Sequence, residues 1–268
     1  MRKRNEGTNL KLKEAEGNAG FLSLFPVKKP VMAMLHLKGE DDGTMLERVR
    51  REVDIYVMNG VDAVIVEDYF GTYDSMVQAL EYVESQHLSI PYGVNCLNVD
   101  PMGFELARRF NAAFVQLDSV VGHVKPRDEK SIAAFLAKER SDYAGYVLGG
   151  VRFKYQPVLS EHTVEEDLAI AKGRCDSVVV TQDATGQETS VDKVRRFRDA
   201  LGASFPLIVG AGLTPENARK TLCIADGAIV GSYFKDTGKD DGEVSGERVS
   251  LLMGEVGRIR EVAGAEGN

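Results

Sequence analysis

Short apolar runs alternate with longer amphipathic stretches along almost the whole chain. Eight such runs recur about every 28 residues, close to the roughly 30 residues of a βα unit. Because most of them are apolar almost throughout, they are typical of parallel strands buried on both faces. The expected strands are Val31–His36, Asp62–Glu67, Pro91–Cys96, Ala113–Asp118, Tyr146–Lys154, Asp176–Thr181, Pro206–Gly210 and Gly227–Gly231.

The stretches between the runs have the period of amphipathic helices. In Gly43–Asn59, for example, Met45, Val49 and Val53 form an apolar stripe with arginines outside it. Similar patterns predict helices over Tyr73–Gln86, Met102–Asn111, Glu129–Arg140, Val164–Gly173, Val191–Leu201, Pro215–Leu222 and Glu247–Val262.

Eight strands alternating with eight helices predict an α/β chain with a single (β/α)8 TIM barrel over residues 31–268. Residues 1–30 precede the first strand and are expected to be an N-terminal extension. A doubly wound open sheet is the alternative. It is disfavoured because the strands recur evenly and no G-x-G-x-x-G sequence follows the first one.

Composition limits the partners and the location. The chain of 268 residues carries a net charge of −8 and has no long basic run, which argues against a nucleic-acid binder. The 3 cysteines form no CxxC pair, which favours a reducing cytosol over a disulfide framework. The apolar stretches are far shorter than the roughly 20 residues of a membrane span. We therefore expect a cytoplasmic protein without a membrane span; a homo-oligomer is compatible with the sequence.

Polar residues follow most of the expected strands, at the end of a barrel where active sites lie. Carboxylates, amides, a histidine and a lysine directly after apolar runs are unusual unless they line a pocket. Each one alone is equally well explained as a cap of the next turn. The candidates at these ends are His36, Glu67, Asn95, Asp118, Lys154, Asp183 and Thr185.

The last two expected strands end in glycine-rich segments. Gly210 and Gly212 follow the seventh strand, and Gly231 and Ser232 follow the eighth. Loops at these positions frequently bind phosphate through backbone N–H groups, and glycine lets the backbone approach the oxyanion. Lys235 is expected to add a positive charge. The two segments resemble those of phosphate-binding barrels such as the tryptophan synthase α subunit, although glycine-rich turns without a ligand are the simpler alternative.

The strand-end side chains have the chemistry for proton transfer. Glu67 and Asp118 are suited to general acid–base work, or to holding a hard cation such as Mg²⁺, and the sequence leaves the metal open. Neighbouring strands should bring His36 and Asn95 close to Glu67. Lys154 is expected to share a strand face with Arg152. Its acidic surroundings favour an electrostatic or general-acid role over a Schiff-base nucleophile.

Several motifs together resemble the BtpA/SgcQ family over about residues 30 to 256. They include Ala33-Met34-Leu35-His36-Leu37, Gly60 to Glu67, Gly93 to Asn98, Val179-Val180-Thr181 with Thr185-Gly186, Val209 to Asn217, and Ala225 to Ser232 with Lys235. The resemblance implies a TIM-barrel enzyme of poorly defined reaction, in a family associated with photosystem I biogenesis or sugar-uptake gene clusters. The chain departs from the family pattern at Asp68, Asn98 and Gln182-Asp183, so no member's substrate is carried over.

Two functions of different classes follow. The first is an enzyme acting on a small phosphorylated metabolite, a sugar phosphate or a nucleotide-like compound, by isomerase, lyase or glycosyl-transfer chemistry. Its catalytic residues would be Lys154, Glu67, Asp118 and His36, and the remaining candidates would bind substrate. The alternative is a non-catalytic assembly or regulatory factor of the photosystem-biogenesis type.

Overall fold

The eight strands close into one parallel barrel in chain order, as the sequence predicts. The computed structural model describes residues 20–121, 129–159 and 161–265. The strands are β1 Val31–His36, β2 Ala63–Glu67, β3 Tyr92–Asn95, β4 Phe114–Leu117, β5 Tyr146–Gly150, β6 Ser177–Val180, β7 Leu207–Val209 and β8 Gly227–Val230. The chain therefore forms a (β/α)8 TIM barrel.

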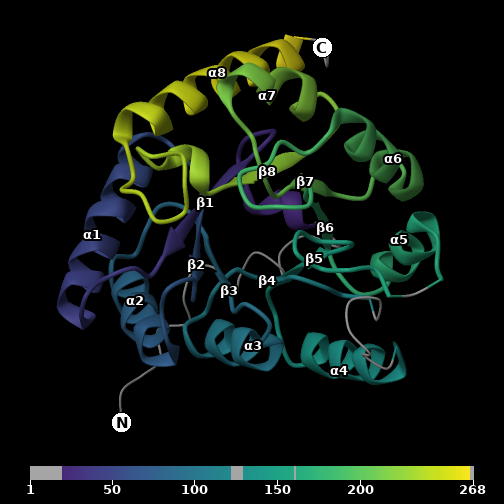
Figure 1. Ribbon diagram of the computed structural model, residues 1–268, viewed down its shortest axis with the longest axis horizontal. Helices are drawn as coiled ribbons and strands as arrows, with labels where there is room; N and C mark the ends of the chain where they lie inside the picture. The colour runs from purple at the N-terminus through teal and green to yellow at the C-terminus, as the bar shows by residue number, and fades with distance from the viewer. Residues whose placement is uncertain (1–19, 122–128, 160, 266–268) are drawn as a thin grey trace.

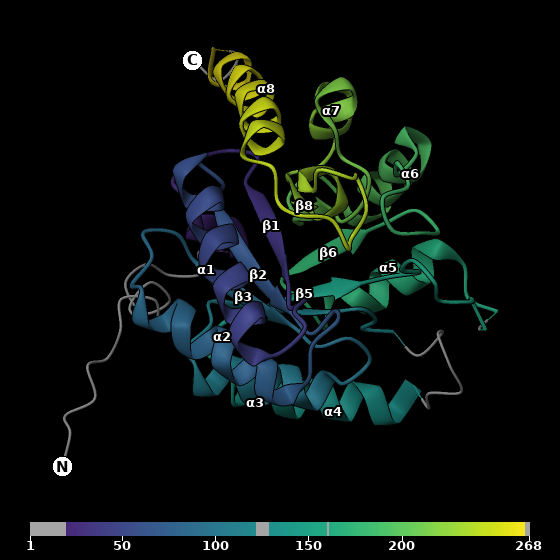
Figure 2. The same cartoon turned by 60° about the vertical axis from the view of Figure 1, so that its left-hand side comes forward.

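An α-helix follows each strand, and the helices form the outer layer (Figure 1). Helix α8 packs against both α1 and α7, so the end of the chain closes the ring beside its start (Figure 2). None of the described helices is long and apolar enough to cross a membrane. The helices are α1 Asp42–Met58, α2 Tyr73–Ser85, α3 Asp100–Arg109, α4 Glu129–Ser141, α5 Val164–Lys172, α6 Val191–Leu201, α7 Pro215–Leu222 and α8 Gly246–Ala265.

Alternation along the strands separates two apolar cores. One lies between the strands and the helices, and it includes Cys96. The other fills the barrel, and Met32 and Met34 of β1 belong to it. Room for the Phe114 ring inside the barrel comes from Gly93 on the neighbouring strand, because a Cβ there would lie 2.2 Å from that ring.

The segment before β1 packs against the barrel interior at the N-terminal ends of the strands. Residues Phe21–Leu24 form a 3₁₀ turn, η1, and Phe21 is fully buried. Its ring makes edge-to-face contacts with Phe114 and Tyr146, at centroid distances of 5.7 and 6.0 Å. This part of the expected extension therefore contributes to the core, whereas residues 1–19 lie outside the described residues.

The fifth strand is shorter than expected. It ends at Gly150 instead of Lys154, because Arg152 adopts a left-handed backbone with φ of 49°. The prediction that Arg152 and Lys154 share a strand face is therefore wrong. Arg152 reaches outward to Asp167 on α5, with Nε 2.8 Å from the carboxylate, whereas Lys154 lines the central cavity.

Candidate active site

Four polar side chains stand side by side at the C-terminal ends of the first four strands. The register pairs His36 with Glu67, Glu67 with Asn95, and Asn95 with Gln116. They continue the inward-facing positions of their strands, so they form the layer directly above the apolar filling of the barrel. His36, Glu67 and Gln116 line a cavity of about 250 Å³.

Glu67 is the centre of this row. One carboxylate oxygen lies 3.0 Å from His36 Nε2, and the other accepts from Asn95 Nδ2 at 2.9 Å. His36 Nδ1 faces the main-chain carbonyl of Asp240 at 3.2 Å. The imidazole and the carboxylate are therefore placed to exchange a proton beside the cavity.

Asp118 follows β4 directly and lies next to this row. Burial, reinforced by the charge of Glu67 and opposed by Lys154, raises its pKa to about 7. One Asp118 oxygen, Asn95 Oδ1 and Gln116 Oε1 are buried without a hydrogen-bond partner in the described part of the chain. A neutral carboxyl is a donor as well as an acceptor, so a protonated Asp118 suits these surroundings and has a proton to give near pH 7.

The raised pKa of Asp118 predicts how stability changes with pH. Between pH 4 and 7 the folded protein holds a proton that the unfolded chain has released, so stability falls as the pH rises through this window. Asp118→Asn removes the titration. We expect the variant to gain about 2–4 kcal/mol over the parent at pH 8 and to lose that advantage towards pH 4. Urea unfolding at several pH values measures the difference, and a constant difference would contradict the shift.

Lys154 supplies positive charge to the cavity from the β5 side. Its backbone amide is held by the Thr181 hydroxyl at 2.8 Å, and its ammonium lies 5.8 Å from the Phe153 ring. Its charge opposes the upward shift of the Asp118 pKa, which places it on the same side of the site. The structure thus brings together Lys154, Glu67, Asp118, His36 and Asn95, as the strand ends predict.

Three loops on the opposite side of the cavity expose backbone to it. Thr185 and Gly186 follow β6, Gly210 and Gly212 follow β7, and Gly231 and Ser232 follow β8; all line the cavity. Gly212 has φ of 69°, and a Cβ there would lie 2.3 Å from the Gln187 carbonyl oxygen, so this approach requires glycine. Within the described residues, the amides of Gly212, Gly231 and Ser232 donate to no other protein group. They are therefore available to an oxyanion.

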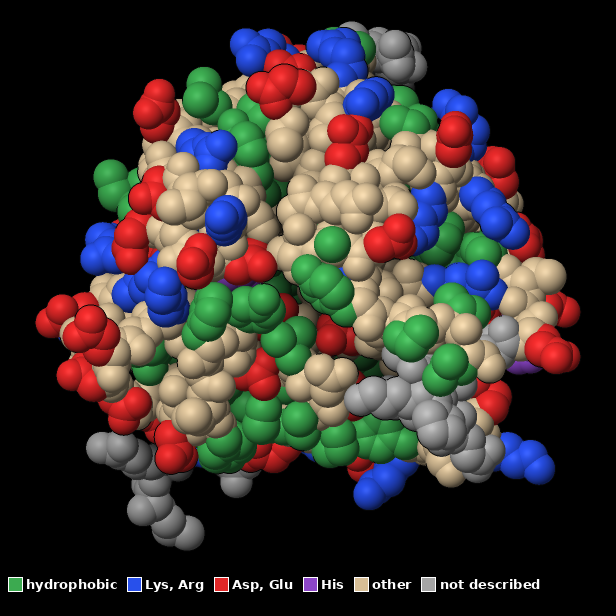
Figure 3. Space-filling view, viewed as in Figure 1, with side chains coloured by type: hydrophobic (Ala, Val, Ile, Leu, Met, Phe, Trp, Pro, Cys, Tyr) green, Lys and Arg blue, Asp and Glu red, His purple; other side chains and the backbone are tan. Residues whose placement is uncertain are grey.

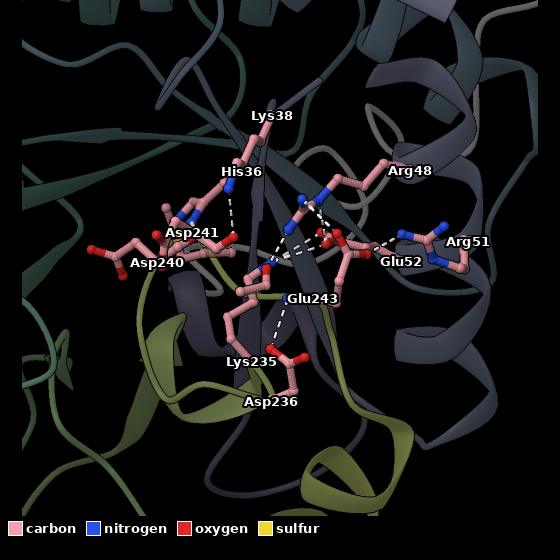
Figure 4. Close-up of polar contacts among 12 residues, drawn as sticks. His36, Lys38, Arg48, Arg51, Glu52, Lys235, Asp236, Asp240, Asp241 and Glu243 are labelled. Atoms are coloured by element: carbon pink, nitrogen blue, oxygen red, sulfur yellow. Dashed lines mark hydrogen bonds and ion pairs between the residues drawn. The ribbon is translucent and has the colours of Figure 1, made fainter. Parts of the chain in front are cut away.

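Sequence reasoning missed the loop that covers the β1 and β8 side of the cavity. Residues 236–243 connect η2, a turn over Ser232–Phe234, to α8. Asp240 contacts His36 Nδ1 through its carbonyl (Figure 4). Its carboxylate accepts from the Ser232 hydroxyl at 2.5 Å. The Asp241 carbonyl accepts from Lys38 Nζ at 2.8 Å.

The expectation that Lys235 gives charge to a phosphate is wrong. Its side chain is fully buried, with Nζ 3.1 Å from both carboxylate oxygens of Glu52 on α1 (Figure 4). Arg48 joins the same group, 2.9 Å from Glu52 and 2.8 Å from Glu243. The pairing arises because η2 turns Lys235 away from the cavity and toward α1. The charged network of Lys235, Glu52, Arg48 and Glu243 therefore fixes the two ends of the 236–243 loop and does not bind phosphate.

Arg248 is the cation that faces the glycine-rich loops. It comes from the first turns of α8, lines the cavity and lies with its guanidinium carbon 4.9 Å from the centre of the Tyr233 ring. It also donates to the Lys235 carbonyl. Its position depends on the long connection after β8, so nothing in the local sequence marks it. Gln116, which sequence reasoning also missed, could have been found from the sequence, because it is a polar residue inside an otherwise apolar strand.

Asp183, a predicted substrate-binding residue, does not line the central cavity. It lines a separate hollow between the β5–α5 connection and α6, together with Arg152 and Lys193. Thr185 does face the cavity, and its buried hydroxyl has no hydrogen-bond partner in the described structure.

Among the described residues, no group of three or more His, Cys, Asp and Glu side chains is placed to hold a metal ion.

Comparison with known proteins gives the family. The model of the BtpA family matches residues 27–258. The chain belongs to the BtpA family. An uncharacterised protein of Pyrococcus furiosus is 26% identical over 251 residues, covering 84% of this chain and 94% of that protein. The photosystem I biogenesis protein BtpA of Synechocystis is 24% identical over 255 residues, covering 85% of this chain and 88% of that protein.

Solved structures share the fold of this BtpA-family chain at low identity. A structure described as native KDPGal superposes with a TM-score of 0.61 at 13% identity, covering 86% of this chain and 95% of that one. The (S)-3-O-geranylgeranylglyceryl phosphate synthase of Thermoplasma acidophilum, in complex with sn-glycerol-1-phosphate, gives 0.58 at 16% identity, with coverage of 87% and 94%. The thiamine phosphate pyrophosphorylase of Pyrococcus furiosus gives 0.56 at 16%, with coverage of 86% and 96%.

Proposed function

We propose that this BtpA-family barrel is an enzyme that binds a small phosphorylated metabolite and transfers protons on its non-phosphate end. The observation that carries the proposal is that two complementary sets of groups face one cavity. Unoccupied backbone amides and Arg248 lie on the side of β7 and β8, and Glu67 with His36 lies on the side of β1 and β2. The first set suits an oxyanion, and the second suits acid–base chemistry.

The residues divide into two roles. Glu67, through its pair with His36, takes a proton from the bound metabolite, and Asp118 or Lys154 returns one. The amides of Gly212, Gly231 and Ser232 hold the phosphate, so its binding energy positions the reacting end. An isomerase, a lyase or a glycosyl-transfer enzyme needs such a donor and acceptor pair. Two barrels of similar fold carry phosphorylated compounds in their names, which agrees with the proposal.

Arg248→Gln tests the phosphate half. We expect the variant to bind ribose 5-phosphate about ten- to a hundredfold more weakly, because a charge-assisted hydrogen bond contributes roughly 1.5–3 kcal/mol. Isothermal titration calorimetry measures the affinity. Arg258→Gln is the matched control, since Arg258 lies on the same helix with its side chain 66% exposed and pairs with Glu255. Equal affinities of the Arg248 variant and the parent would refute the placement of the phosphate.

The assembly-factor alternative rests on the name of the Synechocystis relative. It predicts that a panel of sugar phosphates and nucleotides leaves the melting temperature unchanged. The enzyme proposal predicts a rise, because a ligand at a hundred times its Kd stabilises the folded state by about 2.7 kcal/mol. A flat panel together with stable capture of a defined protein partner would favour the alternative.

A further inference from the structure

An exposed aromatic residue next to two residues of the cavity has an unfavourable backbone conformation. Phe70, in the connection between β2 and α2, is 51% exposed and has φ of 70°. It is the third residue of a turn closed by the Gly71 amide on the Asp68 carbonyl at 2.9 Å. A turn with positive φ at this position normally takes glycine or asparagine. Phenylalanine is strained in this conformation, and half of its apolar side chain stays in water.

The Phe70 ring extends an aromatic group that begins inside the cavity. Tyr69 lines the cavity, and its ring lies 5.1 Å from that of His36 and 4.6 Å from that of Phe70. The Phe70 and Tyr69 rings are nearly perpendicular, at 86°. Lys38 Nζ lies 5.8 Å from the centre of the Phe70 ring. Hydrophobic side chains gather beside the central hollow on the face viewed in Figure 3.

This aromatic group is within reach of the glycine-rich loops. A Cβ at Gly231 would lie 3.6 Å from His36 Cε1, and the His36 ring is 6.4 Å from that of Phe70. The imidazole therefore lies between Gly231 and the two aromatic rings. A ligand with its phosphate at the Gly231 and Ser232 amides would extend past the imidazole to place a planar group against Tyr69 and Phe70.

We infer that Tyr69 and Phe70 form a stacking platform for an aromatic heterocycle, so that the phosphorylated substrate is of the nucleotide class and not a simple sugar phosphate. The inference rests on the proposed function for the phosphate position. Aromatic side chains stack on every nucleobase, because each base has a π-face, and this stacking contributes about 1–3 kcal/mol per base. Half of the Phe70 side chain is exposed, so it is accessible to such a group.

The test compares AMP and UMP with ribose 5-phosphate by isothermal titration calorimetry on the full chain. We expect the nucleotides to bind at least about tenfold more tightly than the sugar phosphate. Phe70→Ala should remove most of that advantage and change the ribose 5-phosphate affinity less than about twofold. Leu251→Ala, which truncates a side chain that is 54% exposed on α8, is the control and should change neither.

Equal binding of AMP and ribose 5-phosphate, or an unchanged AMP affinity of the Phe70 variant, would overturn the platform while leaving the phosphate site in place. Adenosine separates the two proposals when no phosphorylated compound binds. Saturating NMR shifts of the Tyr69 ring protons with adenosine, absent in Phe70→Ala, would support the platform although the phosphate proposal had failed. No shift at millimolar adenosine would overturn the platform as well.

Discussion

Replacing Glu67 by glutamine is expected to lower kcat/KM by about 10²–10⁴, the range that a positioned general base contributes. The amide keeps the shape of the carboxylate and still accepts from Asn95 Nδ2, the bond that measures 2.9 Å in the parent. It has no basic oxygen, and its NH₂ faces His36 Nε2. That NH₂ can donate to Nε2 while Nδ1–H donates to the Asp240 carbonyl, so the variant keeps the hydrogen bonds of the site.

Turnover is measured with the phosphorylated metabolite that the ligand panel identifies. The Glu67→Gln variant should bind it with nearly unchanged affinity, because the phosphate contacts lie on the other side of the cavity. Glu105→Gln on α3 is the matched control and should retain full activity. Full turnover by the Glu67 variant would remove this residue from the catalytic group, whatever the phosphate loops bind.

Glu52→Leu is expected to lower the free energy of unfolding by about 3–5 kcal/mol, more than any other variant proposed for this protein. Glu52 and Lys235 are both fully buried, and Arg48 is 7% exposed. Burial lowers the pKa of Lys235, opposed mainly by the charge of Glu52. Removing the carboxylate leaves Lys235 without the counter-charge of Glu52, whereas Arg48 keeps its contacts with Glu243 and the Gly242 carbonyl.

The double variant Glu52→Leu/Lys235→Met distinguishes this charge effect from lost packing. Replacing both partners of a buried pair with apolar side chains is often neutral, so we expect it to recover more than half of the loss. Urea unfolding of the full chain measures both variants. A single variant within about 1 kcal/mol of the parent, or a double variant as unstable as the single one, would contradict the assigned role of the network.

The barrel was predictable because its strands are buried on both faces and its helices on one face. The strands therefore appear as continuous apolar runs, and the helices as apolar residues repeated every three or four positions. The error at strand five has a local cause. Tyr146 to Lys154 is largely apolar, but the left-handed backbone at Arg152 ends the strand early. The pattern of apolar residues does not indicate where a non-glycine residue adopts a positive φ.

The site was predictable where the residues belong to the strand ends themselves. His36, Glu67 and Asn95 meet because parallel strands in register bring their last inward residues to one layer. Arg248 and Asp240 were not predictable, because the path of the long β8–α8 connection places them. The same path buries Lys235 against α1, which inverts its expected role.

The most direct test of the central claim is a ¹⁵N NMR titration of the full chain with ribose 5-phosphate. The account predicts that the amide signals of Gly212, Gly231 and Ser232 shift together and saturate with a single Kd, since these amides receive the phosphate. Saturating shifts confined to other parts of the surface, or no shift of these three amides at millimolar ligand, would contradict it.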